Sequence, residues 1–359
     1  MEPTEFLSAE ERFVAPSDPS LQYTGRINFE IPSSPVFEHP YTSVKMRFTG
    51  TKVKVVIKNR HYYWDNFLGF LIDGVQQKIQ IPEHDKMICI TLAENLTYQE
   101  HELFFFKRMD ACHTFAFYGF ILENNSELSA PEEKPARKIE VFGDSVSAGE
   151  ISEAVEYTGK SDPPHNGEYS NSYYSYATMT ARKLHAQLHD VAQGGIALLH
   201  GTGWYSEPDY IGMEEVWDKT SFHPELAANR KWDFNKYVPN VVIVAIGQND
   251  SHPVDYMQKN SRSAKSENWR NHYEAFLRAL RQTYPKALII AATTILYHDK
   301  SWDDSIDEVC GRIADSRIVH FLYSRNGTGT PGHIRIPEAE AMSDELSAFI
   351  RSFGDSVWD

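Results

Sequence analysis

The sequence predicts an α/β protein with a parallel sheet covered by helices on both faces, preceded by an all-β domain of the jelly-roll (β-sandwich) type. In the first third of the chain, apolar residues recur at every second position, which is typical of half-buried strands. From about residue 138, continuous apolar runs alternate with amphipathic stretches, as in parallel strands connected by helices. With 359 residues the chain exceeds what one hydrophobic core usually serves, so we expect two domains.

The first predicted domain covers residues 1–125 and consists of short strands without long helices. Asp73-Gly74 is a hairpin signal at the end of one apolar run. Predicted strands lie in residues 43–59, which hold two strands around Gly50-Thr51, and in residues 67–74, 101–110 and 114–123. Many short strands of this kind indicate a sandwich or jelly roll.

Residues 126–137 are predicted to be an exposed linker, because they contain Pro131, Pro135 and several charges. The second predicted domain covers residues 138–359. Its predicted strands are residues 138–144, a short strand before Gly195, residues 239–250 and residues 286–294, and its predicted helices are residues 175–189, 267–285 and 338–350. We find no internal repeat at the spacing of solenoid proteins.

Charge and composition exclude several classes of partner. The formal net charge is −15, which argues against nucleic acid or an anionic membrane surface. No apolar run approaches the roughly 18 residues of a membrane span. The 15 histidines have no metal-ligand spacing and the sequence lacks an HExxH motif, so we expect no metal. We also expect no cofactor, since hydrolysis by a serine and a histidine requires none. An uncharged substrate is compatible with this negative net charge.

The cysteines and the first residues indicate a compartment. Cys89, Cys112 and Cys310 lie far apart without a CxxC pair, which favours a reducing environment. The first residues are acidic where a secretory signal would be basic and then apolar. We therefore expect a cytoplasmic protein, or a secreted one if a signal peptide has been removed.

Four points of the second domain carry candidate catalytic residues. Ser145 follows the strand at 138–144, Gly195 follows a short second strand, Asn249 ends the strand at 239–250, and His333 precedes the last helix. Because the carboxyl ends of parallel strands meet at one crevice, residues distant in sequence can converge there. Each alone has an ordinary structural interpretation, such as a turn or an exposed histidine. Their common order is more specific.

The chemistry that these residues allow is acyl transfer. A serine hydroxyl becomes a nucleophile when a neutral imidazole takes its proton, which gives Ser145 and His333 their predicted catalytic roles. Attack on a carbonyl places negative charge on its oxygen, and fixed donors must point there. The backbone N–H groups of Ser145 and Gly195 and the side-chain amide of Asn249 are the predicted oxyanion donors.

The same segments resemble the SGNH (GDSL-like) hydrolases, and in detail carbohydrate esterase family 2, whose members join a jelly-roll domain to an SGNH domain. The resemblance rests on the segments "VFGDSVSAGE", "VAQGGIALLH", "VVIVAIGQND" and "GHIRIPEAEA". It implies a nucleophile at Ser145, a base at His333 and oxyanion donors at Gly195 and Asn249. It also implies a serine esterase that removes O-acetyl groups from plant polysaccharides or oligosaccharides such as xylan and mannan.

The chain departs from the family pattern around its histidine. The SGNH pattern has an aspartate three residues before the base, where this chain has Thr330. Either a backbone carbonyl orients His333, giving a dyad, or another acid reaches in. The loop before His333 also lacks the aromatic residue often found in relatives, so the sugar would be held elsewhere.

Candidates for holding the sugar lie near Gly195 and Asn249. Trp204 and Tyr205 follow the oxyanion glycine, and His252 could line the same crevice. Residues 151–174 are polar and aromatic, which is typical of a lid or subsite loop, although a solvated insertion would look the same. Two alternatives remain open for the whole chain: an SGNH lipase or thioesterase acting on other short acyl esters, and a non-catalytic carbohydrate-binding protein.

Overall fold

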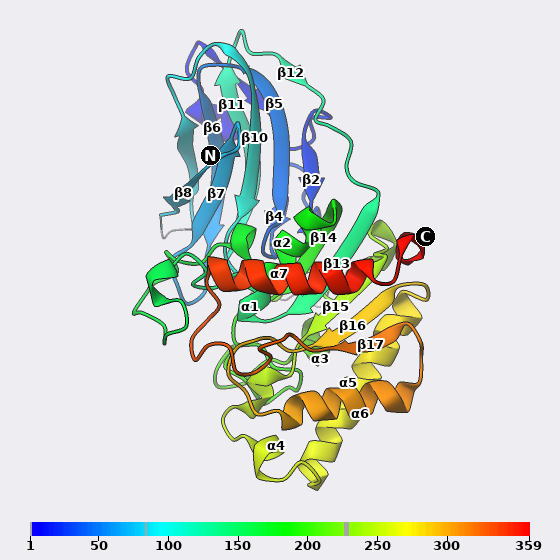
Figure 1. Cartoon of the computed structure of the whole chain (residues 1–359). Helices are drawn as coiled ribbons and strands as arrows, with labels where there is room; N and C mark the ends of the chain where they lie inside the picture. The colour runs from blue at the N-terminus through cyan, green and yellow to red at the C-terminus, as the bar shows by residue number, and fades with distance from the viewer. Residues whose placement is uncertain (1, 83–84, 226–229) are drawn as a thin grey trace.

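The computed structural model describes residues 2–82, 85–225 and 230–359. Two antiparallel sheets formed by the first third of the chain stand above a parallel sheet with helices on both faces (Figure 1). This is the predicted fold class. Residues 130–136 connect the last strand of the sandwich to the first strand of the parallel sheet.

The sandwich consists of two antiparallel sheets of short strands. One sheet has the order β3 (Ile27–Asn28), β4 (Val36–Phe37), β11 (Thr114–Glu123), β6 (Val53–Arg60) and β9 (Met87–Ala93), with β1 (Glu11–Val14) also paired to β11. The other has the order β12 (Leu128–Ser129), β5 (Ser43–Gly50), β10 (Gln99–Lys107), β7 (Phe67–Ile72) and β8 (Val75–Gln80), with β2 (Gln22–Thr24) paired to β5.

Phenylalanines fill the space between the two sheets. Phe105 of β10 meets Phe115, Phe117 and Phe120 of β11 with ring centroids 5.6 to 6.1 Å apart. All four rings are fully buried. Successive strand residues point to opposite faces, so the alternation seen in the sequence places this apolar face inward.

The parallel sheet has the order β14 (Ala186–Ala192), β13 (Arg137–Gly143), β15 (Val241–Ala245), β16 (Leu288–Ala292) and β17 (Ile318–Phe321). The central strands β15 and β16 are completely buried, which explains their continuous apolar sequences. Of these strands, β13 comes first in the sequence, and the next two strands pair with its opposite edges, β14 on one side and β15 on the other. Ligands of open α/β sheets bind beyond the strand ends at this reversal of direction.

Helices cover both faces of the parallel sheet. The α-helices are α1 (Ser145–Ala148), α2 (Tyr176–Lys183), α3 (Met213–Val216), α4 (Tyr256–Lys259), α5 (Ala264–Thr283), α6 (Ser301–Ile313) and α7 (Ile336–Arg351). The 3₁₀ turns are η1 (Pro3–Phe6), η2 (Val155–Tyr157), η3 (Ser172–Tyr174), η4 (Phe234–Lys236), η5 (Gln248–Ser251) and η6 (Asp355–Trp358). Helices α2 and α7 pack on one face, and α5 and α6 on the other. None of the helices in the described part of the chain is long and apolar enough to span a bilayer.

Two features of this sheet differ from the sequence interpretation. The helix predicted at residues 175–189 ends at Lys183, because His185 adopts φ +50 and strand β14 begins at Ala186. Helix α6 and strand β17 were not predicted. Strand β17 has four residues at the sheet edge, with a mixed burial pattern that gives little periodic signal.

A buried ion pair joins the sandwich to the parallel sheet. Arg26, between β2 and β3, lies 3.2 Å from the carboxylate of Glu140 on β13, and both side chains are fully buried. The Tyr284 hydroxyl donates to the other oxygen of Glu140 at 2.6 Å. Since a buried charge without a partner is costly, this contact constrains how the sandwich packs on the parallel sheet.

Candidate active site

The predicted nucleophile lies where β13 passes into helix α1. Asp144 caps this helix, because its carboxylate accepts from the Val146 N–H at 3.0 Å. The amides of Gln248 and Asn249 donate to the other oxygen of Asp144 at 2.8 and 3.2 Å. Burial raises the pKa of Asp144 to about 6. These bonds hold the ends of β13 and β15 together with Ser145 at their edge.

A cavity of about 620 Å³ opens at this edge. Ser145, Gly195, Asn249 and His333 all line it, so folding brings the four predicted catalytic positions to one space. Trp204 and Tyr205 line the same cavity. The size suits a small organic ligand or a sugar ring with an ester group.

His333 is held by Asp162, which comes from the polar segment at residues 151–174. Asp162 Oδ2 lies 2.6 Å from His333 Nδ1, and Asp162 Oδ1 accepts from the His333 N–H at 2.8 Å. The buried Arg335 donates to the same Oδ1 at 2.8 Å. Of the two possibilities left by Thr330, the structure thus has an acid from elsewhere in the chain. Asp162 was not identified from the sequence, because 171 residues separate it from the histidine.

The absence of a side chain at Gly332 makes room for this acid. A Cβ at Gly332 would lie 2.4 Å from the Lys160 carbonyl oxygen and 2.7 Å from Asp162 Oδ1, closer than real Cβ atoms approach. The missing aromatic residue before His333 and the approach of Asp162 are therefore parts of one local arrangement.

The electrostatics of the histidine follow from its acidic neighbours. His333 Nε2 lies 3.3 Å from Glu150 Oε2, so a carboxylate faces each ring nitrogen. Although burial alone would lower it, the contacts with Asp162 and Glu150 raise the pKa of His333. Although burial alone would raise it, His333 and Arg335 hold the pKa of Asp162 well below its usual range.

Two of the three predicted oxyanion donors are free within the described part of the chain: neither the Ser145 nor the Gly195 backbone N–H donates to another group there. Gly195 has φ +71, and a Cβ would lie 2.8 Å from the Trp204 Cβ, so the close approach requires glycine. The Asn249 amide already donates to Asp144 and, at 3.0 Å, to the Ile196 carbonyl. An oxyanion would replace the longer of these two bonds, that to Asp144.

Comparisons with known proteins cover most of the chain. Residues 23–131 match the family described as carbohydrate esterase 2 N-terminal. The acetylxylan esterase / glucomannan deacetylase of Cellvibrio japonicus is 26% identical over 357 residues, covering 98% of this chain and 94% of that protein. The cellulase/esterase CelE of Acetivibrio thermocellus is 27% identical over 347 residues, covering 93% of this chain but only 40% of that longer protein. A solved family two carbohydrate esterase from Clostridium thermocellum, in complex with cellohexaose, has a TM-score of 0.76 at 26% identity and covers 93% of this chain and 98% of that one.

The chain is thus similar over most of its length to a family two carbohydrate esterase, and its residues 23–131 match the N-terminal family model. The matched residues form most of the sandwich, and the structural likeness extends over the parallel sheet. The resemblance stated from the sequence is thereby confirmed.

The sandwich supplies part of the cavity wall. Tyr62, Tyr63 and Trp64 follow β6 and line the cavity. They were not identified as site residues, although three successive aromatic residues between two strands are an unusual signal. Aromatic faces suit the apolar C–H faces of a sugar ring.

The three residues predicted to hold a sugar lie in different positions. Trp204 is 61% exposed and presents its ring to the cavity. Tyr205 is only 2% exposed, and its hydroxyl donates to the Phe222 carbonyl. His252 is not among the residues that line the cavity. Its ring stacks on Trp204 with centroids 3.3 Å apart, and its Nδ1 lies 2.7 Å from the Gly203 carbonyl oxygen, so it supports Trp204 from behind.

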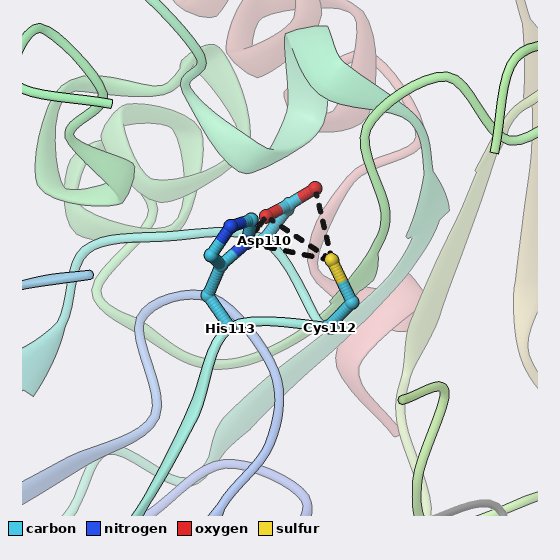
Figure 2. Close-up of side chains that lie close together, drawn as sticks. All are labelled: Asp110, Cys112 and His113. Carbon is cyan, nitrogen blue, oxygen red and sulfur yellow. Dashed lines mark hydrogen bonds and ion pairs between the residues drawn. The ribbon is translucent and has the colours of Figure 1, made fainter. Parts of the chain in front are cut away.

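A second cluster next to the cavity has residue types that can bind metals. Figure 2 shows Asp110, Cys112 and His113 with their side chains close together. The Trp64 N–H donates to His113 Nε2 at 3.1 Å, so the ring proton is on Nδ1 and points to Asp110 Oδ1 at 2.6 Å. Burial lowers the pKa of His113 and raises that of the Cys112 thiol. With both ring nitrogens engaged, the cluster is a hydrogen-bond network.

This network supports the loop that carries Gly195. The other oxygen of Asp110 accepts from the Gly194 N–H at 2.9 Å and from the Gln193 amide at 2.5 Å. It also accepts from the Tyr63 hydroxyl. Asp110 lies just after β10, so a residue next to the sandwich holds the loop that carries Gly195.

Proposed function

We propose that this protein is a serine esterase that removes O-acetyl groups from acetylated plant polysaccharides or oligosaccharides, such as xylan or mannan. The observation that carries the proposal is one cavity lined by Ser145, by His333 with Asp162 on its Nδ1, and by the free N–H groups of Ser145 and Gly195. The similarity to an acetylxylan esterase / glucomannan deacetylase of Cellvibrio japonicus and to a Clostridium thermocellum structure in complex with cellohexaose supports an acetylated carbohydrate as substrate.

The reaction proceeds through an acetyl-enzyme. Ser145 Oγ attacks the acetyl carbonyl while His333 Nε2 takes its proton, and Asp162 keeps the other ring proton on Nδ1. The N–H groups of Ser145 and Gly195 bind the oxyanion, and Asn249 joins them by exchanging its bond to Asp144. His333 then protonates the departing sugar oxygen. Water, deprotonated by the same imidazole, releases acetate and restores Ser145.

The decisive test is loss of the Ser145 hydroxyl. Ser145→Ala should keep its far-UV circular dichroism spectrum and unfolding midpoint but lose turnover of 4-nitrophenyl acetate. Retained turnover in the folded variant would falsify the nucleophile assignment. Mass spectrometry of acetylated xylo- and manno-oligosaccharides before and after treatment with the wild-type protein would then identify the sugar and the position.

The same measurements separate the other functions. A steep preference for acetyl over octanoyl esters supports the deacetylase, whereas a flat or reversed acyl-chain series indicates a lipase or thioesterase. Binding of cello- or xylo-oligosaccharides without turnover of any ester would indicate a carbohydrate-binding protein.

A further inference from the structure

Glu150 is a buried acid in the cavity for which the proposed reaction has no use. It comes five residues after Ser145, and Gly149, with φ +75, ends helix α1 just before it. The Glu150 N–H donates to the Ser145 carbonyl at 3.0 Å, so its backbone is tied to the nucleophile turn. The residue is only 5% exposed and lines the cavity beside His333.

The Glu150 carboxylate contacts His333 Nε2, the nitrogen that takes the Ser145 proton in the proposed reaction. Its Oε2 lies 3.3 Å from His333 Nε2, and the hydrogen bonds among the described residues include none between Ser145 Oγ and His333. Asp162 holds Nδ1. Among the described residues, Nε2 therefore contacts Glu150 and makes no hydrogen bond to Ser145.

The surroundings of Glu150 offer it little else. Within the described residues, His333 is the only cationic group in an ion pair with it. On its other side is Gly194, where a Cβ would lie 2.0 Å from Glu150 Oε1 and 2.7 Å from Asp110 Oδ2. Two carboxylates thus flank Gly194, and burial together with Asp110 raises the pKa of Glu150. When His333 turns to Ser145, a buried carboxylate loses its partner, which is costly unless a donor replaces it.

We propose that Glu150 is a specificity-determining residue that accepts a hydrogen bond from a free hydroxyl group next to the ester in the substrate, and that this bond releases His333 Nε2 to Ser145. The inference rests on the proposed function, since it concerns the ester that His333 and Ser145 would cleave. A partly acetylated sugar carries such a hydroxyl beside the acetyl group. A fully acetylated sugar or a simple alkyl ester does not.

The test compares two small esters that differ in one donor. Both 2-hydroxyethyl acetate and 2-methoxyethyl acetate carry an oxygen two carbons from the ester, but only the first can donate. For the wild-type protein we expect a ratio of kcat/KM values of about 10- to 150-fold in favour of the hydroxyl ester, the range of one hydrogen bond to a charged group. A wild-type ratio near one overturns the proposal.

Variants of Glu150 test whether this residue causes the kcat/KM ratio between the two esters. Glu150→Leu should bring the ratio to about one, and Glu150→Gln, which keeps an acceptor without the charge, to a value of a few fold. Glu207→Gln is the matched control, because Glu207 is another acid lining the cavity, and it should keep the wild-type ratio. A Glu150→Gln ratio equal to that of the wild type, in a folded protein, contradicts the role even where the Leu variant fails to fold.

The outcome also separates this inference from the proposed function. Turnover of both esters without discrimination leaves the esterase intact and removes only the role of Glu150. Failure of the wild-type protein to cleave either ester or 4-nitrophenyl acetate removes both.

Discussion

Replacing Asp162 by asparagine tests the contact that the structure adds to the predicted pair of Ser145 and His333. The two oxygens of Asp162 have different partners: Oδ2 accepts a hydrogen bond from the His333 ring Nδ1–H, and Oδ1 accepts from the His333 backbone N–H and the Arg335 guanidinium. An amide has one acceptor oxygen and one donor group. Asp162→Asn can therefore satisfy only one side, and its NH₂ must face a donor on the other.

The size of the effect follows from these contacts. A hydrogen bond to a charged group contributes about 1.5–3 kcal/mol, which corresponds to roughly 10- to 150-fold in rate. An asparagine that turns its NH₂ to Nδ1 also favours the wrong tautomer, which in a buried triad lowers kcat about 10⁴-fold. Because Asp162 and His333 are partly exposed and rearrange more easily, we expect kcat to fall by about 10²- to 10³-fold.

The assay is the pH profile of 4-nitrophenyl acetate hydrolysis. The pKa of His333 is raised by its two acids, so removing one should move the acid limb of kcat/KM to lower pH. Glu156→Gln, an exposed acid in the same segment, is the control and should keep both rate and profile. If Asp162→Asn retains kcat within about threefold and an unshifted acid limb, Asp162 does not orient the base and the reasoning is refuted.

Stability gives an independent check on the same pair. The lowered pKa of Asp162 stabilises the fold above the ordinary pKa of aspartate, about 4, and this is lost as the pH falls. The raised pKa of His333 stabilises the fold below the ordinary pKa of histidine, about 6.5, and this is lost as the pH rises through the raised value. The difference in free energy of unfolding between wild type and Asp162→Asn should thus be largest between about pH 4 and 6.5.

Two further predictions concern the cavity wall and the oxyanion loop. Trp204→Ala should raise KM for acetylated oligosaccharides about 5- to 30-fold, for a stacking contribution of about 1–2 kcal/mol, and by less for 4-nitrophenyl acetate; equal changes for both substrates would count against a sugar contact. Asp110→Asn leaves Gly194 or Gln193 without an acceptor, so it should lower the free energy of unfolding in urea by about 1–3 kcal/mol and lower kcat more than it raises KM. Lower stability with unchanged kcat would mean that Asp110 supports the fold and not the loop.

The sequence was informative where a local pattern determines the structure. The buried runs of β15 and β16 and the apolar face of α5, formed by Tyr273, Phe276, Leu277 and Leu280, are regular and were predicted. The step from strand to Ser145 was visible in the Gly143-Asp144-Ser145 turn. These features depend on neighbours a few residues away, which a single sequence contains.

Contacts between distant segments were not accessible in this way. Asp162 reaches His333 across 171 residues, and Asp110 reaches Gly194 across 84. Neither carboxylate stands in a motif, and each looks like one of the 50 acidic residues of the chain. The position of Glu150 could not be predicted from the sequence for another reason. It follows Gly149, whose backbone is in the left-handed conformation, and a glycine permits this conformation but does not require it.

The sandwich and the parallel sheet therefore do not divide into a site-bearing part and a passive support. The sandwich supplies the aromatic wall of Tyr62, Tyr63 and Trp64, and its Asp110 holds the loop of Gly195 through Gly194. Because the Tyr63 hydroxyl donates to the same oxygen of Asp110, a ligand that moves this wall would also disturb the donors of the oxyanion hole. In the proposed reaction, binding of the sugar and polarisation of the ester would thus be coupled through this one carboxylate, and we expect the parallel sheet without the sandwich to be a poor catalyst even with Ser145 in place.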